Sequence, residues 1–166
     1  LRLRQICCHP ALVDPAHAEM PSAKLEALLE RVEELAEEGH QVLVFSQFVQ
    51  MLNIIKDRLE EREIGHLILT GSTENRAELV DTFQKDPSKT VFLLSLKAAG
   101  FGLNLTAASY AILYDPWWNP AAEAQAIDRI HRIGQTKPVI AYRFITASSV
   151  EEKIRARQHE KAALAA

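Results

Sequence analysis

Short apolar runs alternate along this chain with longer segments whose apolar residues recur every three or four positions. The runs have the length and composition of buried strands, and they lie at 41–46, 66–69, 90–95, 110–114 and 139–145. The intervening segments predict amphipathic helices over 23–38, 48–63, 74–85 and 120–133, with a charged terminal helix beginning at Val150. This alternation predicts an α/β fold, an open and mostly parallel sheet with helices on both faces.

Capping residues mark the ends of two predicted helices. Ser22 precedes the first of them as an N-cap, and Gly39 follows its last turn. Asn119 and Pro120 suit the N-cap and first position of the helix over 120–133, and Gly134 suits the position after it.

Polar and glycine-containing loops follow four of the predicted strands. In parallel sheets, ligands gather at the carboxyl ends of strands, so these loops predict a binding edge. Ordinary turn chemistry also produces such loops, so each one alone is weak support. The loops are Ser46–Gln47, Thr70–Ser72, Lys97–Asn104 and Asp115–Asn119.

The helix over 120–133 presents a basic face. Gln125, Arg129 and Arg132 are spaced i, i+4 and i+7, so they share one side of the helix. Two guanidinium groups on a rigid helix suit a multiply charged oxyanion such as a nucleotide phosphate. The alternative is a solvated basic face in which Asp128 pairs with one arginine.

Phosphate-loop chemistry is missing from this sequence. Gly100 and Gly102 follow a strand, but the third glycine of a dinucleotide fingerprint is absent, and no Gly-Lys-Ser/Thr run occurs. Without that loop and a paired acidic magnesium site, these residues alone should not hydrolyse ATP.

Composition sets broad limits on function. The chain has 166 residues, 48% hydrophobic and 25% charged, which fits one globular domain. Its formal charge of −3 gives no global attraction for nucleic acid, so any such contact must use a local basic patch. The adjacent Cys7 and Cys8 disfavour a disulfide, and no metal-ligand spacing accompanies them. No apolar run is long enough to span a bilayer, and the first residues do not have the pattern of a signal peptide. The start at Leu1, without a Met, predicts a fragment of a longer protein.

Segments along nearly the whole chain resemble one family, the second RecA-like lobe of Swi/Snf-type ATPases, DNA translocases of helicase superfamily two. The segments are Leu3–Pro10, Ser22–Leu25, Val42–Phe48, Thr70–Thr73 with Arg76, Ser95–Thr106, Trp117–Pro120, Asp128–Gln135 and Val150–Ile154. The resemblance implies a RecA-like three-layer sheet with this organisation: an inter-lobe linker at 1–21, the lobe at 22–149 and a terminal brace helix at 150–166. It also implies a nucleoid-associated cytoplasmic protein in a prokaryote, or a nuclear one in a eukaryote.

By this resemblance, Arg129 and Arg132 are arginine fingers toward the γ-phosphate of ATP, and Gln125 couples nucleotide and DNA states. Gly102, Asn104 and Asp128 are expected near the nucleotide. ATP with Mg²⁺ is expected to bind mainly to an N-terminal lobe of the same protein, and no cofactor to the isolated chain.

The other implied partner is double-stranded DNA. The resemblance also allows a DNA-bound protein target, and it implies no membrane. Its expected contacts are Ser46, Gln47, Thr70, Gly71, Lys97, Trp118 and Asn119. Trp117 is expected in the core. Lys24 and the charged terminal helix, including Glu151, are expected to face solvent, with Val150 and Ile154 packing that helix onto the domain.

Two other classes of protein fit the sequence less well. A non-catalytic lobe that only binds protein or nucleic acid would have little reason to retain both Arg129 and Arg132. A phospho-acceptor receiver needs clustered acidic residues at the strand ends, where only Asp115 is placed.

Overall fold

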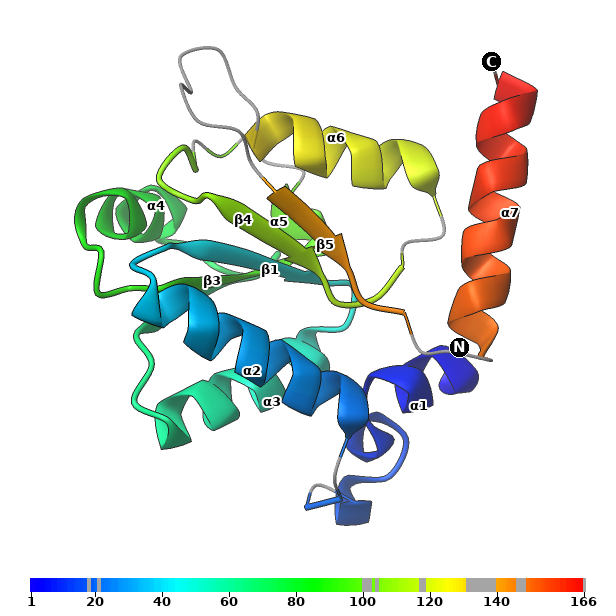
Figure 1. The fold of residues 1–166 in the computed structure, drawn as a ribbon, viewed down its shortest axis with the longest axis horizontal. Coiled ribbons are helices and arrows are strands. Elements are labelled where there is room, and N and C mark those ends of the chain that lie inside the picture. The colour runs from blue at the N-terminus through cyan, green and yellow to red at the C-terminus, as the bar shows by residue number, and fades with distance from the viewer. Residues whose placement is uncertain are drawn as a thin grey trace.

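The computed structural model describes residues 1–17, 19–20, 22–99, 103, 105–116, 119–130, 140–145 and 149–165. A five-stranded parallel sheet forms its centre, with strand order β2-β3-β1-β4-β5 (Figure 1). The strands are β1 (Val42–Ser46), β2 (His66–Leu69), β3 (Val91–Ser95), β4 (Tyr110–Leu113) and β5 (Ile140–Arg143). The predicted parallel α/β sheet is therefore confirmed, and each strand lies within two residues of its predicted bounds.

Seven α-helices are described, together with two short 3-10 turns, η1 (Pro10–Leu12) and η2 (Pro15–His17). The helices are α1 (Arg2–Cys8), α2 (Ala23–Glu37), α3 (Val49–Glu61), α4 (Arg76–Lys85), α5 (Leu96–Ala99), α6 (Pro120–Ile130) and α7 (Val150–Ala165). The short α5 occupies the start of a segment predicted as loop. The predicted end of the α6 segment, at 131–134, lies outside the described residues.

Alternation along the strands separates two cores, one on each face of the sheet. Val42 and Val44 of β1 face α2 and α3, whereas Leu43 and Phe45 face the opposite side, where Phe83 of α4 is buried. Figure 1 shows the same division, with α2 and α3 below the sheet and α4, α5 and α6 on its other side. The fold is thus three-layered.

Helix α2 begins and ends as its capping residues predict. The Ser22 hydroxyl accepts a hydrogen bond from the Leu25 amide at 3.3 Å, which satisfies one free N–H of the first turn. Gly39 adopts a φ of 80°, the left-handed conformation that terminates helices, and the His40 amide returns to the Leu35 carbonyl at 2.9 Å.

The N-terminal segment packs on the lobe. Cys8 is fully buried and Leu12 nearly so, and both belong to the core that α2 and α3 cover. The inter-lobe role predicted for residues 1–21 stays a prediction, but part of this segment completes the core. In the described part of the chain, none of the helices combines the length and apolar character needed to cross a bilayer.

Candidate functional site

The carboxyl ends of the parallel strands converge on one edge of the sheet. Ser46 ends β1 beside Ser95, the last residue of β3, and Tyr114 continues β4 through a bond from its amide to the Phe45 carbonyl at 2.9 Å. The loops after β1, β2, β3 and β4 therefore share this edge, as their sequence predicts.

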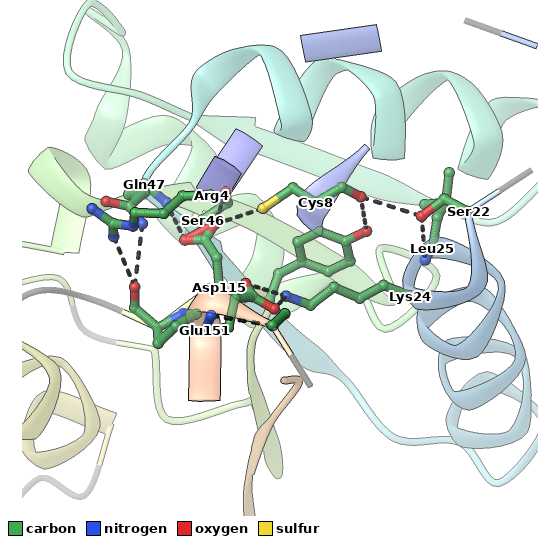
Figure 2. A network of polar contacts seen from close by, with 12 residues as sticks. Arg4, Cys8, Ser22, Lys24, Leu25, Ser46, Gln47, Asp115 and Glu151 are labelled. Atoms are coloured by element: carbon green, nitrogen blue, oxygen red, sulfur yellow. Dashed lines mark hydrogen bonds and ion pairs between the residues drawn. The ribbon is translucent and has the colours of Figure 1, made fainter. Parts of the chain in front are cut away.

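A buried carboxyl group lies at the centre of this edge. Asp115 is 1% exposed, and its Oδ2 accepts hydrogen bonds from Ser46 Oγ at 2.6 Å and from the Cys8 thiol at 3.8 Å. Its Oδ1 accepts the backbone N–H of Gln47 at 3.0 Å (Figure 2). Burial raises the pKa of Asp115, and the hydrogen bonds from Ser46 and Gln47 oppose that rise.

This environment excludes the receiver interpretation. A phospho-acceptor carboxylate must meet solvent and a phosphate donor, whereas Asp115 is enclosed and bonded to neutral donors. Within the described residues, no group of three or more His, Cys, Asp or Glu side chains is arranged to hold a metal ion.

The backbone carbonyl of Pro116, the residue after Asp115, joins two segments that are distant in sequence. Pro116 O accepts a hydrogen bond from Gln47 Nε2 at 3.2 Å and another from Arg4 Nη2 at 3.0 Å. Figure 2 shows the Arg4 and Gln47 side chains meeting beside Asp115. Helix α1 and the loop after β1 are therefore fastened to the same point of the chain.

The sequence predicts a Ser46 hydroxyl at the surface, but the structure places it inside the protein. Its exposed fraction is 0%, its Oγ donates to Asp115, and the same oxygen accepts the Phe48 amide at 3.1 Å. Both functions of the hydroxyl are used inside the protein, so the Ser46 hydroxyl is not available to a phosphate. Gln47, the next residue, is partly exposed and stays an expected phosphate contact.

The structure brings Thr70, Gly71 and Lys97 together, although 26 positions separate the last two in sequence. A Cβ added to Gly71 would lie 3.1 Å from Lys97 Cδ, so the lysine stem lies against the glycine backbone. Lys97 is exposed, and Thr70 Oγ1 lies 3.1 Å from Ser72 Oγ. Arg76 Nη2 donates to the Gly71 carbonyl at 2.9 Å, which fixes the turn. The stem of Lys97 is thus in contact with the turn that follows β2.

Lys24 and Glu151 contradict the expectation that both face solvent. Lys24 Nζ lies 2.6 and 2.7 Å from the two carboxylate oxygens of Glu151, and the side chains are only 6% and 1% exposed. The ammonium also lies 4.9 Å from the Tyr114 ring centroid. The prediction was wrong because α7 packs against α1, which brings Glu151 in its first turn to Lys24 at the start of α2. A lysine in a first helical turn opposes the helix dipole, which was the signal that it needed an anionic partner.

Burial along α7 supports the remaining packing expectation. Ile154 is 3% exposed and Val150 is half-buried.

The structure describes only some of the remaining predicted site residues. Gln125 is exposed on α6, and Asn119 Oδ1 accepts the Ala121 amide at 3.0 Å, which confirms its predicted capping role. The side chains of Asp128 and Arg129 lie outside the described residues, although their backbones belong to α6. The positions wholly outside are Gly102, Asn104, Trp117, Trp118 and Arg132.

Comparison with known proteins gives this geometry a family. A model described as "Helicase conserved C-terminal domain" matches residues 23–134. The "ISWI chromatin-remodeling complex ATPase ISW1" of Saccharomyces cerevisiae is 42% identical over 174 aligned residues, covering 97% of this chain and 15% of that protein. The human "Lymphoid-specific helicase" is also 42% identical, over 92% of this chain and 20% of its own length.

This chain is a helicase C-terminal lobe of the Snf2 family. The lobe superposes on a structure titled "Sulfolobus solfataricus SWI2/SNF2 ATPase core in complex with dsDNA" with a TM-score of 0.83 and 37% identity. That match covers 98% of this lobe and 35% of the other chain. The C-terminal part of the Fun30 ATPase domain gives a TM-score of 0.79 at 37% identity, over 93% of this lobe and 53% of that chain.

The Snf2-family lobe spans a small part of its relatives. It covers only between 10% and 20% of the curated proteins that it matches. Their names describe chromatin-remodelling ATPases, a helicase and a DNA repair protein.

Proposed function

We propose that this chain is the second motor lobe of an ATP-dependent double-stranded DNA translocase. The observation that carries the proposal is the match of 98% of the chain to an ATPase core whose title includes bound double-stranded DNA. The polar surface at the strand ends supports it independently. In a eukaryotic source the protein would act in the nucleus, as the names of its remodelling relatives suggest.

The DNA-facing part of the lobe is the edge after β1, β2 and β3. Lys97 supplies an ammonium, Thr70 a hydroxyl, Gly71 a backbone N–H and Gln47 an amide. Such groups bind phosphate oxygens without reading bases, which suits a motor that moves along any sequence. The net charge of −3 makes this local surface, rather than the whole lobe, the source of attraction.

The nucleotide-facing part is α6 and the segment after it. Arg129 and Arg132 stabilise negative charge that develops on the transferring phosphoryl group, while ATP and Mg²⁺ are held mainly by a first lobe. Gln125 lies one helical turn before Arg129, where it links the nucleotide state to the DNA-facing edge. Gly102, Asn104 and Asp128 complete the nucleotide side.

The arginine-finger role is tested in a protein that contains both lobes. Arg132→Ala should lower DNA-stimulated ATP hydrolysis about a thousandfold, because the transition-state charge loses its partner, while DNA affinity changes little. Arg62→Ala is the matched control, since that guanidinium pairs with Glu26 and Glu33 on the surface of α2. Wild-type turnover by Arg132→Ala would rule out the finger.

The DNA-facing surface is tested by salt dependence. Lys97→Ala should weaken binding to every DNA sequence alike and lower the slope of log affinity against log salt by about one, as expected for one lost phosphate contact. Lys85→Ala is the control, because Lys85 is exposed on α4 and pairs with Asp81. An unchanged slope for Lys97→Ala would exclude that residue from the interface.

A further inference from the structure

Gln47 is held from two directions by two consecutive residues. Its backbone N–H donates to Asp115 Oδ1 at 3.0 Å, and its side-chain Nε2 donates to the Pro116 carbonyl at 3.2 Å. Gln47 connects the end of β1 to Phe48, the residue that precedes α3. Both the path of the chain and the direction of the amide are therefore set by the segment after β4.

Asp115 is itself held rigidly. Strand β4 lies in register beside β1, with Leu113 opposite Phe45, so Asp115 and Gln47 leave the sheet side by side. Ser46 Oγ donates to the Asp115 carboxyl at 2.6 Å, and the Cys8 thiol approaches the same oxygen from α1. A carboxyl group buried among neutral donors costs stability compared with an apolar residue. The bond from Gln47 to Asp115 offers a function that offsets this cost, because it orients Gln47, a partly exposed residue.

We propose that Asp115 is a positioning residue, which holds Gln47 so that the Gln47 amide meets the DNA backbone. This inference rests on the DNA-facing role proposed above. Because one Nε2 hydrogen is used by Pro116, the amide is fixed in direction and its second hydrogen remains for a phosphate oxygen. Arg4 bonds to the same carbonyl, so helix α1 stabilises this arrangement from the other side.

A double-mutant cycle measures the dependence of one residue on the other. The affinity of the 166-residue chain for a fluorescent DNA duplex at low salt is read by anisotropy for the wild type, Gln47→Ala, Asp115→Asn and the double variant. Losing one phosphate hydrogen bond should weaken binding about threefold to tenfold in Gln47→Ala. Asp115→Asn should weaken it by a similar factor, and the double variant should be no weaker than Gln47→Ala alone.

Cys8→Ala is the matched control. It removes a contact to the same carboxyl group but none to Gln47, so it should lower the urea midpoint of unfolding and leave DNA affinity unchanged. A purely structural role for Asp115 would make Asp115→Asn behave like Cys8→Ala. That result, or factors that multiply in the double variant, would overturn the positioning role while leaving DNA contact by Gln47 intact. Undiminished affinity of Gln47→Ala would overturn the contact and the positioning together.

The wild-type protein offers a second measurement that needs no folded Asp115 variant. Protonation of the Asp115 carboxyl removes its charge and weakens its bond from Gln47. DNA affinity should therefore fall as the pH is lowered. The midpoint of that fall should equal the titration midpoint of the Asp115 carboxyl ¹³C resonance, and Gln47→Ala should lack this step.

Other ionisable groups that face Asp115 are the Cys8 thiol from α1, Lys24 from α2, Glu151 from α7 and, one residue before it, Tyr114. The ¹³C resonance assigns the step to Asp115 rather than to these neighbours. The proposal would be contradicted if DNA affinity fell at a different pH from the midpoint of the ¹³C titration. It would also be contradicted if the pH-dependent fall in affinity persisted in Gln47→Ala.

Discussion

The buried ion pair between Lys24 and Glu151 provides a quantitative test of how α7 is attached. Its side chains are 6% and 1% exposed, and the ammonium lies 2.6 and 2.7 Å from the two carboxylate oxygens. At an effective dielectric constant of about 20, two charges this close attract by about 6 kcal/mol before desolvation is subtracted. Removing one partner leaves the other charged and buried, which costs about 3–5 kcal/mol.

Lys24→Met and Glu151→Leu should therefore each lower the free energy of unfolding by about 3–5 kcal/mol. In a domain of this size, such losses lower the melting temperature by about 6 °C or more. The double variant should recover most of the loss, because two apolar side chains of similar volume leave no buried charge behind. Urea denaturation followed by circular dichroism gives the four free energies of the cycle.

Lys85→Met is the surface control for this cycle. Lys85 and Asp81 pair at 2.9 Å, but their side chains are 74% and 59% exposed, so the loss should not exceed about 0.5 kcal/mol. Single variants of the buried pair that cost no more than Lys85→Met would refute the reasoning, as would a double variant whose loss equals the sum of the singles.

Three further results are expected. Gly65→Ala should destabilise the protein by about 3 kcal/mol or more, because its Cβ would lie 1.9 Å from the Ser88 carbonyl oxygen; a smaller loss in urea would show that this loop moves easily. Gly39→Ala meets no atom within 4 Å and should cost only the left-handed backbone strain, about 1–2 kcal/mol. Burial and Arg58 lower the pKa of His9 below its ordinary 6.5, so the unfolded state binds the proton more readily, and stability should fall as pH drops below about 6.5. Urea midpoints at pH 5 and 7 test this, and His9→Gln should flatten the difference.

Much of the fold could be predicted because its signals are local. The segments 41–46 and 90–95 are apolar at consecutive positions rather than at every second one. This pattern is typical of a parallel strand that is buried on both faces. Ser22 and Gly39 could be assigned as caps because the geometry of a helix end depends on a few neighbouring residues. That the loops after the strands share one edge of the sheet could be predicted because parallel strands end on the same side.

The roles of single polar residues could not be predicted in the same way. Ser46 and Lys24 are of residue types that are usually exposed, yet both are buried. Their hydrogen-bond partners, Asp115 and Glu151, lie 69 and 127 positions away in the sequence. A donor is buried only where an acceptor from another part of the chain meets it, and sequence spacing carries no record of that meeting.

The sequence by itself determined the alternating strands and helices, the caps and the motifs that mark the family, since these depend on neighbouring residues and on hydrophobic periodicity. Only the tertiary structure decided which polar groups face solvent and which hold one another. Helix α7 packs against α1 and brings Glu151 to Lys24, which turns two apparent surface charges into an internal pair. The register of β4 against β1 likewise placed a carboxyl group where it directs Gln47, because long-range packing sets which hydrogen-bond partners meet.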